Sequence, residues 1–430
     1  MGRWWVRVLI VGSGAREHAL TWKALQSELS TAVYCAPGNA ATGAIAVNTD
    51  IEATDAPSIV RFVKERDVGL TIIGPEAAVA AGLADRLAEA GRLVFGPTAA
   101  AGRIESSKAF AKQLMSRAGV ATPAHHVFDE VTRARDFVRG EKRPFVVKAD
   151  GLAKGKGTIV ANDVDETLRA IDQLMVERNL GSAADSILLE ERIEGREVSL
   201  MAMVDGRRVV PLPPACDYKR ALENDQGPNT GGMGGYSPPG FFSSGDSQDA
   251  VRTVFEPVVA ALAEAGTPYR GCLYAGLMVS ERGIQVLEFN ARFGDPEAQV
   301  VLPRLDGDLL PMMEAAAAGD LSDSSPNWSP RPSVGVVLTS KGYPGNYQVG
   351  VPIEGLGRIE RDTFAFHGGT SAGPSGYETA GGRVLTVVAL GDSIAEARDR
   401  AYRGAQRIRF EGMSFRSDIA RREIEVGATP

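Results

Sequence analysis

The chain has 430 residues, of which 44% are hydrophobic and 23% are charged, and its formal net charge at pH 7 is -7. This length accommodates two to four domains, and because the net charge shows no basic bias we expect no nucleic-acid partner. No stretch approaches the ~20 apolar residues of a membrane span, and the start lacks the features of a signal peptide. Cys35, Cys216 and Cys272 stand apart without disulfide or metal-binding spacing, so we expect a soluble cytoplasmic protein with no membrane partner.

The N-terminal part alternates between strand-like and helix-like runs. Strands are predicted at residues 6–11, 32–36, 70–73 and 93–95, and helices at residues 15–25 and 79–90. Strands that alternate with helices are typical of a parallel sheet with helical crossovers. We therefore expect an α/β domain with a parallel sheet over residues 1–103.

The middle of the chain is richer in strands. A helix is predicted over residues 106–118, Pro123 marks a break, and one further helix is predicted near residues 164–177. Strands are predicted around it, at residues 145–148, 158–161, 186–191, 197–203 and 208–210. Many strands with one helix indicate a small α+β unit that rests on a larger one.

Residues 216–247 consist largely of glycine, proline, serine and asparagine without periodicity. We expect a long loop there, and a long loop inside a compact domain is usually functional. Helices at residues 250–264 and 309–318 and strands at residues 272–279 and 284–289 are expected to follow. After a polar linker at residues 322–332, strands at residues 334–339 and 383–390 and a helix at residues 394–407 predict a small C-terminal α+β domain, residues 326–430.

The first motif is the turn Gly12-Ser13-Gly14-Ala15-Arg16-Glu17-His18, between a strand and a helix. It is similar to the GxGxxG dinucleotide turn, but Glu17 replaces the third glycine. A phosphate can lie at a helix N-terminus, where free N–H groups and the helix dipole attract anions. On this motif alone, a plain strand–helix turn and a phosphate site are equally supported, and a nicotinamide-dinucleotide role is less so.

The second motif, residues 147–157, has three glycines and three lysines between two strands. Glycines let backbone N–H groups approach an anion, and lysines neutralise it. It is not a Walker A motif, because Gly157 stands where a serine or threonine is required. We interpret it as a flexible hairpin that closes over a triphosphate, and the alternative is a solvated basic turn.

The third motif is the end of a strand and its turn, residues 188–197. Such a hinge offers backbone groups to an adenine edge and a carboxylate to ribose hydroxyls. Taken alone, a charged hairpin end remains the favoured interpretation.

The most informative run is residues 286–297, Val-Leu-Glu-Phe-Asn-Ala-Arg-Phe-Gly-Asp-Pro-Glu. In a strand, alternate side chains point to opposite faces, so Glu288, Asn290 and Arg292 are expected on one face, with Leu287, Phe289 and Ala291 on the other. Oxygen ligands of this kind suit Mg²⁺, and arginine suits a carboxylate or phosphate. Alternation alone favours a solvated edge strand over a metal site by roughly two to one.

Together these motifs resemble the ATP-grasp superfamily, and within it most closely the glycinamide ribonucleotide synthetase family, the phosphoribosylamine–glycine ligases. The similarity covers the chain after its first five residues. It rests on the ordered runs GSGAREHAL, APGNA, GPEA, FGPT, SKAF, VKADGLAKGKG, GPNTGGMG and EFNARFGDPE. The resemblance implies an ATP-grasp domain over residues 104–325, with a mobile lid subdomain at about residues 122–192.

This resemblance also implies a reaction. ATP would phosphorylate the carboxylate of glycine, the amine of 5-phosphoribosylamine would attack the acyl phosphate, and glycinamide ribonucleotide, ADP and phosphate would leave, as a step of de novo purine synthesis. Another ATP-grasp carboxylate–amine ligase is the alternative. The expected partners are these small molecules with Mg²⁺ or Mn²⁺, and a monomer is expected.

Residue roles follow only from the resemblance. It implies Glu288 and Asn290 as metal ligands and Arg292, Asp295 and Asp217 as catalytic residues. The residues implied in ATP binding are Lys108, Lys148, Gly151, Gly155, Lys156, Gly157, Glu190, Glu191, Ile193 and Glu197. Those implied in binding phosphoribosylamine are Lys219, Arg220, Asn229, Thr230 and Gly231, with Gly14, Arg16 and Glu17 from the N-terminal domain.

Three features depart from the family pattern. Tyr218 stands where histidine is usual, and we expect it to alter contacts between its loop and the ribose phosphate. Lys154 stands where a small residue is common and adds a charge near ATP. Residues 273–279 carry no acid where many relatives have one, which leaves the ligands of a second metal open.

Three rival functions remain at this stage. A nicotinamide-dependent oxidoreductase would use the first glycine turn, although no histidine constellation supports it. A non-catalytic nucleotide sensor would tolerate the loss of Arg292. A carboxylase-type ATP-grasp enzyme would act on bicarbonate.

Overall fold

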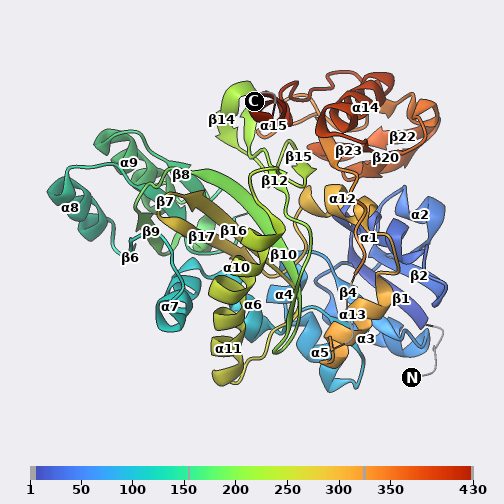
Figure 1. Cartoon of the computed structure of the whole chain (residues 1–430), viewed down its shortest axis with the longest axis horizontal. Coiled ribbons are helices and arrows are strands. Elements are labelled where there is room, and N and C mark those ends of the chain that lie inside the picture. The colour runs from blue at the N-terminus through green and yellow to red at the C-terminus, as the bar shows by residue number, and fades with distance from the viewer. Residues whose placement is uncertain (1–5, 154, 323–325, 428–430) are drawn as a thin grey trace.

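The computed structural model describes residues 6–153, 155–322 and 326–427, which form an N-terminal domain, a central pair of sheets and a C-terminal domain (Figure 1). A five-stranded sheet of order β3-β2-β1-β4-β5 with parallel pairing forms the N-terminal domain. Its strands are β1 (Val6–Gly12), β2 (Ser30–Pro37), β3 (Val47–Asn48), β4 (Leu70–Ile73) and β5 (Val94–Phe95). Its helices are α1 (Ala15–Ala24), α2 (Thr42–Ile45), α3 (Ala56–Glu65), α4 (Glu76–Ala80), α5 (Leu83–Glu89) and α6 (Ala99–Ser106). The parallel sheet expected from the sequence is confirmed.

Two details of this domain differ from the prediction. The single helix expected over residues 79–90 is two helices, because Gly82 interrupts it in a left-handed conformation. Helices α3 and α6 were not predicted. The apolar positions of α3 do recur at helical spacing, at Ala56, Ile59 and Val63, which are buried, so this helix was detectable from its pattern.

The lid region forms a separate antiparallel sheet of order β6-β9-β7-β8. Its strands are β6 (His125–Phe128), β7 (Val146–Ala149), β8 (Thr158–Val160) and β9 (Ile187–Glu190). Two helices cover it, α8 (Val131–Glu141) and α9 (Val164–Ile171), the latter continued by a π-helical turn at Asp172–Val176. The prediction of one helix is wrong, because the five charged residues within α8 hide the buried Ala134 and Val138.

A second antiparallel sheet, of order β11-β10-β16-β17, faces the lid sheet. Its strands are β10 (Arg196–Asp205), β11 (Val209–Pro211), β16 (Arg270–Ser280) and β17 (Gly283–Asn290). The helices around it are α7 (Lys108–Ala118), α10 (Ser244–Ala250), α11 (Glu256–Glu264), α12 (Glu297–Val301) and α13 (Leu310–Ala318). Hydrogen bonds tie the two sheets together, from Lys148 Nζ to the carbonyl of Leu287 at 3.0 Å and from Thr122 Oγ1 to that of Val286 at 2.7 Å.

A bulge in β17 changes the expected face pattern. Val286 pairs with Leu277 and Glu288 with Gly276, so Leu287 lies outside the ladder. Val286, Phe289 and Ala291 are therefore the buried residues, and the prediction that Leu287 shares their face is wrong. The bulge leaves the carbonyl of Leu287 to accept the hydrogen bond from Lys148.

The glycine-rich stretch after residue 215 is not the long loop that was predicted. It forms β12 (Cys216–Asp217), β13 (Arg220–Leu222), β14 (Gln226–Asn229) and β15 (Gly234–Ser237). β13 and β14 form a hairpin, whereas β12 and β15 join the C-terminal sheet in the order β12-β15-β18-β23-β20. The two glycines of β15 give no apolar alternation, and the other three strands have two to four residues each, which is too few for a pattern to be recognised. In Figure 1, β14 and β15 extend from the central sheets toward the C-terminal domain.

The C-terminal domain completes that sheet and adds a small one, β19-β22-β21. Its strands are β18 (Ser333–Thr339), β19 (Pro352–Ile353), β20 (Thr363–His367), β21 (Thr370–Gly373), β22 (Gly376–Thr379) and β23 (Arg383–Leu390), and its helices are α14 (Ile394–Arg407) and α15 (Arg421–Gly427). In the ranges that the structure describes, no helix combines the length and apolarity needed to cross a membrane.

Two histidines connect the N-terminal and C-terminal domains. His18 on α1 and His367 on β20 lie with ring centroids 5.5 Å apart, and the backbone N–H of His367 donates to Nδ1 of His18 at 2.9 Å. Asn39 joins the same interface, donating to the carbonyls of Ser13 and His367, each at 2.9 Å. Burial and the neighbouring His367 lower the pKa of His18 from 6.5 to about 3, and burial lowers that of His367 to about 4.

This interface is expected to weaken in acid. A histidine whose pKa is lowered by folding contributes stability that is fully present above pH 6.5 and is lost as the pH falls toward its folded pKa. For His18 the loss between pH 7 and pH 5 is about 2 kcal/mol of unfolding free energy. Urea unfolding at both pH values should show a shallower pH dependence for His18→Gln than for the unsubstituted chain, and equal slopes would contradict this assignment.

Candidate active site

Two lysines lie where the sheets face each other. Lys148 on β7 forms an ion pair with Glu190 at 2.8 Å, and both side chains are nearly inaccessible. Lys108, the first residue of α7, donates to the carbonyl of Gly151 at 3.4 Å, and burial lowers its pKa. The carboxylate of Asp150 accepts from the N–H of Ala109 at 2.7 Å and so fixes the glycine loop against the start of α7. Both lysines predicted for a triphosphate are thus brought to one place.

Glu190, the partner of Lys148, also pairs with Lys112, a residue that was not predicted from the sequence. Lys112 Nζ lies 3.2 Å from Glu190 and donates to Thr122 Oγ1 at 2.6 Å. Burial lowers the pKa of Lys112 to about 8, and the two lysines hold that of Glu190 below its usual value despite burial. The carboxylate of Glu190 is therefore committed to lysines, which leaves backbone groups of the hinge for an adenine.

The described residues of the glycine loop, 151–153 and 155–157, contact Thr230 and the C-terminal domain. A Cβ placed on Gly155 would lie 2.9 Å from the carbonyl of Thr230, and Lys156 Nζ donates to the carbonyl of Pro344 at 3.2 Å. Gly157 accepts the N–H of Ala149 at 2.8 Å through its carbonyl. Lys154, singled out in the sequence, lies outside the described residues.

The hinge between the two sheets, residues 191–195, is more open. Glu191 and Ile193 are partly accessible. Glu197 and Lys219, predicted for ribose and for the second substrate, form an ion pair with each other. One carboxylate and one ammonium thus meet at the boundary between the two expected substrate positions.

Hairpin β13–β14 carries the other residues predicted for the second substrate. Arg220 Nη1 and Asn229 Oδ1 lie 3.5 Å apart across it, and Asn229 also donates to the carbonyl of Thr158 in the lid sheet at 2.9 Å. Thr230 Oγ1 donates to the carbonyl of Lys219 at 2.9 Å. The hairpin therefore connects the lid with the central sheets.

Glu288 and Asn290 lie together at the end of β17, facing these lysines. Lys219, Lys148, Lys108 and Arg292 hold the pKa of Glu288 below its usual value although it is buried. The opposing residue, Gly276, has no side chain, and a Cβ there would lie 3.4 Å from Glu288 Cγ. The facing strand therefore packs closely against the Glu288 side chain at this position.

This pair fits a nucleotide-bound Mg²⁺. In the described ranges, no group of three or more His, Cys, Asp or Glu side chains could hold a metal ion by itself. Mg²⁺ commonly takes one or two carboxylates and fills its other positions with water and phosphate oxygens. A carboxylate and an amide oxygen beside two lysines match that requirement.

Arg292 follows β17 and is held by acids from the N-terminal side of the site. Its Nη2 lies 3.1 Å from Glu105 and its Nε 3.7 Å from Glu76, while Nη2 also donates to Asn290 Oδ1 at 3.3 Å. These carboxylates raise the pKa of Arg292 against the effect of burial. Its buried Nε has no hydrogen-bond partner. Glu105 was not predicted, and it lies far from Arg292 in the sequence.

Asp295 is where the three domains meet. Its Oδ2 forms an ion pair with Arg383 of the C-terminal domain at 3.1 Å, and its Oδ1 accepts from Gln299 at 2.7 Å. A Cβ on Gly14 of the N-terminal turn would lie 3.7 Å from the same carboxylate. Arg383, together with Arg16, lowers the pKa of Asp295 despite burial. Asp295 is thus neutralised from within the protein.

Asp217 belongs to a buried polar cluster. The hydroxyl of Ser199 lies 2.8 Å from that of Tyr274, 3.2 Å from Glu297 and 3.5 Å from Asp217. Burial raises the pKa of Asp217, with Lys219 opposing and Glu297 adding to the effect. Glu297 and Tyr274 were not predicted as site residues. Tyr274 pairs with Asn290 on the neighbouring strand, which brings this cluster next to Glu288 and Asn290.

The first glycine turn is filled by its own glutamate. Glu17 is buried and accepts from the N–H of Gly14 and from Arg16 Nε, each at 2.7 Å, and a Cβ on Gly12 would lie 2.6 Å from Glu17 Cγ. The helix N-terminus thus has an internal anion, which leaves little room for a dinucleotide phosphate. Arg16 also donates to the carbonyl of Phe293 at 3.1 Å, which ties this turn to the region around Arg292.

Tyr218 packs toward the C-terminal segment, and its effect on substrate contacts stays a prediction. It is buried, its hydroxyl accepts from the N–H of Ala420 at 2.9 Å, and the guanidinium of Arg416 lies 4.8 Å from its ring centroid. Its role is to pack the segment before α15 against the central part of the chain.

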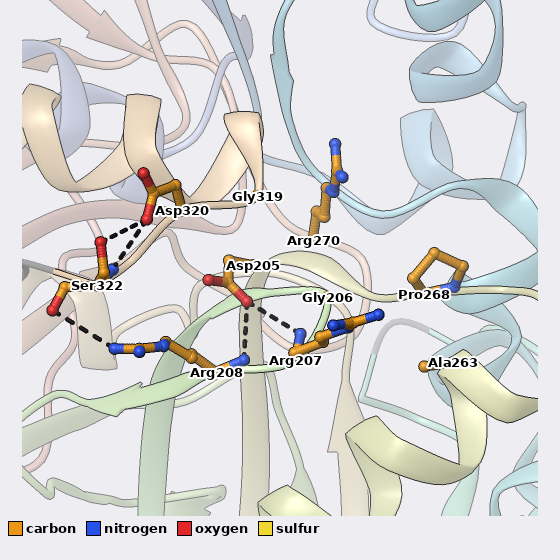
Figure 2. A pocket seen from close by; sticks show the side chains of 10 residues that line it. All are labelled: Asp205, Gly206, Arg207, Arg208, Ala263, Pro268, Arg270, Gly319, Asp320 and Ser322. Carbon is orange, nitrogen blue, oxygen red and sulfur yellow. Dashed lines mark hydrogen bonds between the residues drawn. The ribbon is translucent and has the colours of Figure 1, made fainter.

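One hollow lies apart from all of these residues, at the turn after β10. It measures about 560 Å³ and includes Arg207, Arg208 and Arg270. Figure 2 shows the three guanidinium groups pointing in different directions, and those of Arg208 and Arg270 donate to the carbonyls of Ser322 and Ala317. This hollow therefore has no convergent set of polar groups.

The fold and the site define an ATP-grasp enzyme. Two antiparallel sheets face each other, and between them lie the lysines, the glycine loop and the row of Glu288, Asn290 and Arg292. A solved structure with the same fold is the biotin carboxylase domain of 2-oxoglutarate carboxylase from Hydrogenobacter thermophilus, with a TM-score of 0.72, 16% identity and coverage of 99% of both chains. Models of the phosphoribosylglycinamide synthetase N domain, ATP-grasp (A) domain and C domain match residues 6–105, 106–298 and 333–422. The chain belongs to the phosphoribosylglycinamide synthetase family.

Similar proteins support this placement over nearly the whole length. The phosphoribosylamine–glycine ligase of Halalkalibacterium halodurans is 43% identical over 419 residues, 97% of each chain. That of Vibrio cholerae is 44% identical over 423 residues, covering 97% of this chain and 99% of the other. The crystal structure of the Thermotoga maritima phosphoribosylamine–glycine ligase matches with a TM-score of 0.83 and 32% identity, covering 96% of this chain and all of that one. The present chain is an ATP-dependent ligase of purine biosynthesis.

Proposed function

We propose that this enzyme joins glycine to 5-phosphoribosylamine. The γ-phosphoryl group of ATP passes to the glycine carboxylate, giving glycyl phosphate and ADP. The amine of phosphoribosylamine then attacks the acyl carbon and loses a proton, phosphate leaves, and glycinamide ribonucleotide forms. The observation that carries this proposal is the row Glu288, Asn290 and Arg292 beside Lys108 and Lys148, because it places metal, phosphate and carboxylate binding side by side.

ATP would lie between the two sheets. Lys108 and Lys148 neutralise its phosphates, and the loop over residues 151–157 covers them with backbone N–H groups. Glu288 and Asn290 would hold Mg²⁺ or Mn²⁺, which would neutralise the negative charge of the phosphates. The hinge after Glu190 receives the adenine, and Glu191, Ile193 and Glu197 line the nucleoside end.

Acyl transfer would take place at Arg292. Its guanidinium is held by Glu105 and Glu76 and presents further donors to the glycine carboxylate and to the oxyanion of the acyl-transfer centre. No protein nucleophile is needed, because alignment and charge stabilisation supply the catalysis. Asp217 belongs to the acidic cluster suited to an amine, whereas Asp295 is paired with Arg383 and orders the adjoining turn.

The second substrate would be enclosed by the hairpin and by the N-terminal turn. Lys219, Arg220, Asn229, Thr230 and Gly231 come from the hairpin, and Gly14 and Arg16 from the turn, with Glu17 fixing the turn's shape. We assign the enzyme to the cytoplasm because Cys35, Cys216 and Cys272 are all unpaired and buried. A monomeric state remains a prediction.

The direct test measures ADP release. The complete mixture contains ATP, Mg²⁺, glycine and phosphoribosylamine generated in place from ribose 5-phosphate and ammonia. We expect ADP and glycinamide ribonucleotide in equal amounts, and far less ADP when glycine is replaced by alanine or by bicarbonate. No ADP from the complete mixture would overturn the proposal, and equal activity with alanine would favour another carboxylate–amine ligase.

Replacing Tyr218 with phenylalanine is expected to affect stability and not turnover. The N–H of Ala420 would lose its acceptor, which costs about 1–3 kcal/mol when the group stays buried. Urea unfolding and steady-state kinetics measure the two effects, and Tyr236→Phe is the matched control because its hydroxyl bonds Glu423 at 3.0 Å. A raised KM for phosphoribosylamine with unchanged stability would return Tyr218 to the substrate loop.

A further inference from the structure

Arg383 begins strand β23 of the C-terminal domain and reaches into the candidate active site. Its Nη1 donates to the carbonyls of Gly231 at 2.6 Å and Asp295 at 2.9 Å, and its Nη2 lies 3.1 Å from Asp295 Oδ2. One guanidinium thus binds two backbone carbonyls and one carboxylate. The two segments that it joins are residues 229–232, which begin at the end of hairpin β13–β14, and the turn that follows Arg292.

The backbone around Arg383 is built to let these segments touch. A Cβ on Gly231 would lie 2.9 Å from Arg383 Cζ, and a Cβ on Gly232 would lie 2.5 Å from Pro296 Cδ. A side chain at Gly231 would therefore displace the guanidinium of Arg383, and one at Gly232 would push against the ring of Pro296. The N–H of Gly231 donates to the hydroxyl of Tyr343 at 3.2 Å, a second contact from the C-terminal domain.

These contacts continue to the phosphate loop. The site that a Cβ on Gly155 would occupy lies 2.9 Å from the carbonyl of Thr230, next to the residue that Arg383 holds. Lys156 Nζ donates to the carbonyl of Pro344, beside Tyr343. The loop that carries Gly155 and Lys156 therefore contacts Thr230, and it also contacts the C-terminal domain directly, through Pro344.

We propose that Arg383 is a positioning residue of the ligase reaction, through which the C-terminal domain holds residues 229–232 against the turn at Asp295 and Pro296. This inference rests on the proposed function. Arg383 acts through the backbone of Gly231, so it orders the residues that enclose phosphoribosylamine. The lysines that bind ATP are held by other residues and do not depend on Arg383. Lysine cannot replace it, because an ammonium lacks the planar fork that reaches all three acceptors.

The kinetic test compares Arg383→Ala and Arg383→Lys with the unsubstituted enzyme. We expect kcat to fall about 100-fold, since a displacement of ~1 Å can cost that factor, with KM for phosphoribosylamine raised and KM for ATP unchanged. Arg383→Lys should restore less than a tenth of the activity, roughly the factor set by one lost charge-assisted bond. Unchanged kcat and KM for phosphoribosylamine in Arg383→Ala would overturn the proposal.

A second readout does not depend on which substrates the enzyme uses. Amide hydrogen exchange over residues 226–237 should be faster in Arg383→Lys, while exchange in the lid strand β7 (Val146–Ala149) stays the same. Equal exchange over residues 226–237 would also overturn the proposal. An unsubstituted enzyme that is inactive with glycine and phosphoribosylamine would refute the proposed function but would leave this result interpretable.

Two further variants separate positioning from loss of folding. Arg331→Ala is the matched control: its guanidinium is in the same domain, is 33% exposed against 26% for Arg383, and is paired with Asp362 at 3.2 Å. It should keep the kinetics of the unsubstituted enzyme. Gly231→Ala keeps Arg383 but displaces it, and we expect the same rise in KM for phosphoribosylamine; unchanged kinetics in this variant would count against the proposal.

Discussion

Glu288→Ala is expected to abolish turnover, with kcat lower by at least about 10³-fold. The carboxylate lies among Lys219, Lys148, Lys108 and Arg292, which keep it ionised in spite of burial. Its removal takes away one of the two proposed protein ligands of the metal. It also leaves the four cations without the carboxylate that neutralises them. Both effects act on the phosphate end of ATP, where charge is transferred.

Steady-state ADP release would measure the effect, and Mn²⁺ titration followed by electron paramagnetic resonance in the presence of ADP would show whether metal binding is lost. Glu288→Gln keeps an oxygen but not the charge and should fall between the other two forms. Glu281→Ala, an exposed acid at the turn of the same hairpin, serves as the control and should remain active. Strong Mn²⁺ binding by Glu288→Ala would show that the metal site lies elsewhere.

Arg292→Ala is expected to lower kcat by about 10²–10³-fold, the effect of removing one donor from a preorganised oxyanion site. ATP affinity should change less than kcat, because Arg292 pairs with Glu105 at 3.1 Å and touches the proposed metal ligands only through Asn290 at 3.3 Å. Arg292→Lys should recover little activity, since a planar carboxylate is best held by two parallel N–H groups.

Nucleotide binding measured by calorimetry, beside kcat, separates these two effects. Arg252→Ala is the control, because that arginine is 70% exposed and is paired with Asp249 at 2.8 Å, a residue with no assigned role in the site. Full turnover by Arg292→Ala would contradict this role and would show that another cation orients glycine. A large loss of ATP affinity would place Arg292 at the triphosphate instead.

Much of the fold could be predicted from periodicity. Strands β1 and β4, with their buried apolar runs, and the long helix α14 have strong local patterns. The strand at residues 234–237 could not be predicted, because its partner β18 lies far along the chain and its two glycines give no alternation. The strand at residues 216–217 has only two residues, which is too short to show a pattern. The bulge at Leu287 was equally invisible, since it depends on the register with β16.

The candidate site shows the same division. The row from Glu288 to Arg292 and the lysine–glycine loop are local in sequence and could be recognised as motifs. Lys112, Glu105 and Arg383 were missed because each acts through a partner more than one element away, and an isolated charged residue in a sequence resembles a surface residue. Tyr218 was predicted beside the substrate residues. It does lie between Asp217 and Lys219, but its hydroxyl bonds the backbone of Ala420 in the C-terminal segment.

The sharing of β12 and β15 with the C-terminal sheet has a consequence for dissecting the protein. A chain cut in the linker before β18 would keep every residue assigned to ATP and the metal, yet the outer edge of β15 would have no strand to pair with. An unpaired, glycine-rich edge invites association with other chains. The boundary suggested by the linker is therefore not one at which the enzyme can be divided into independent pieces.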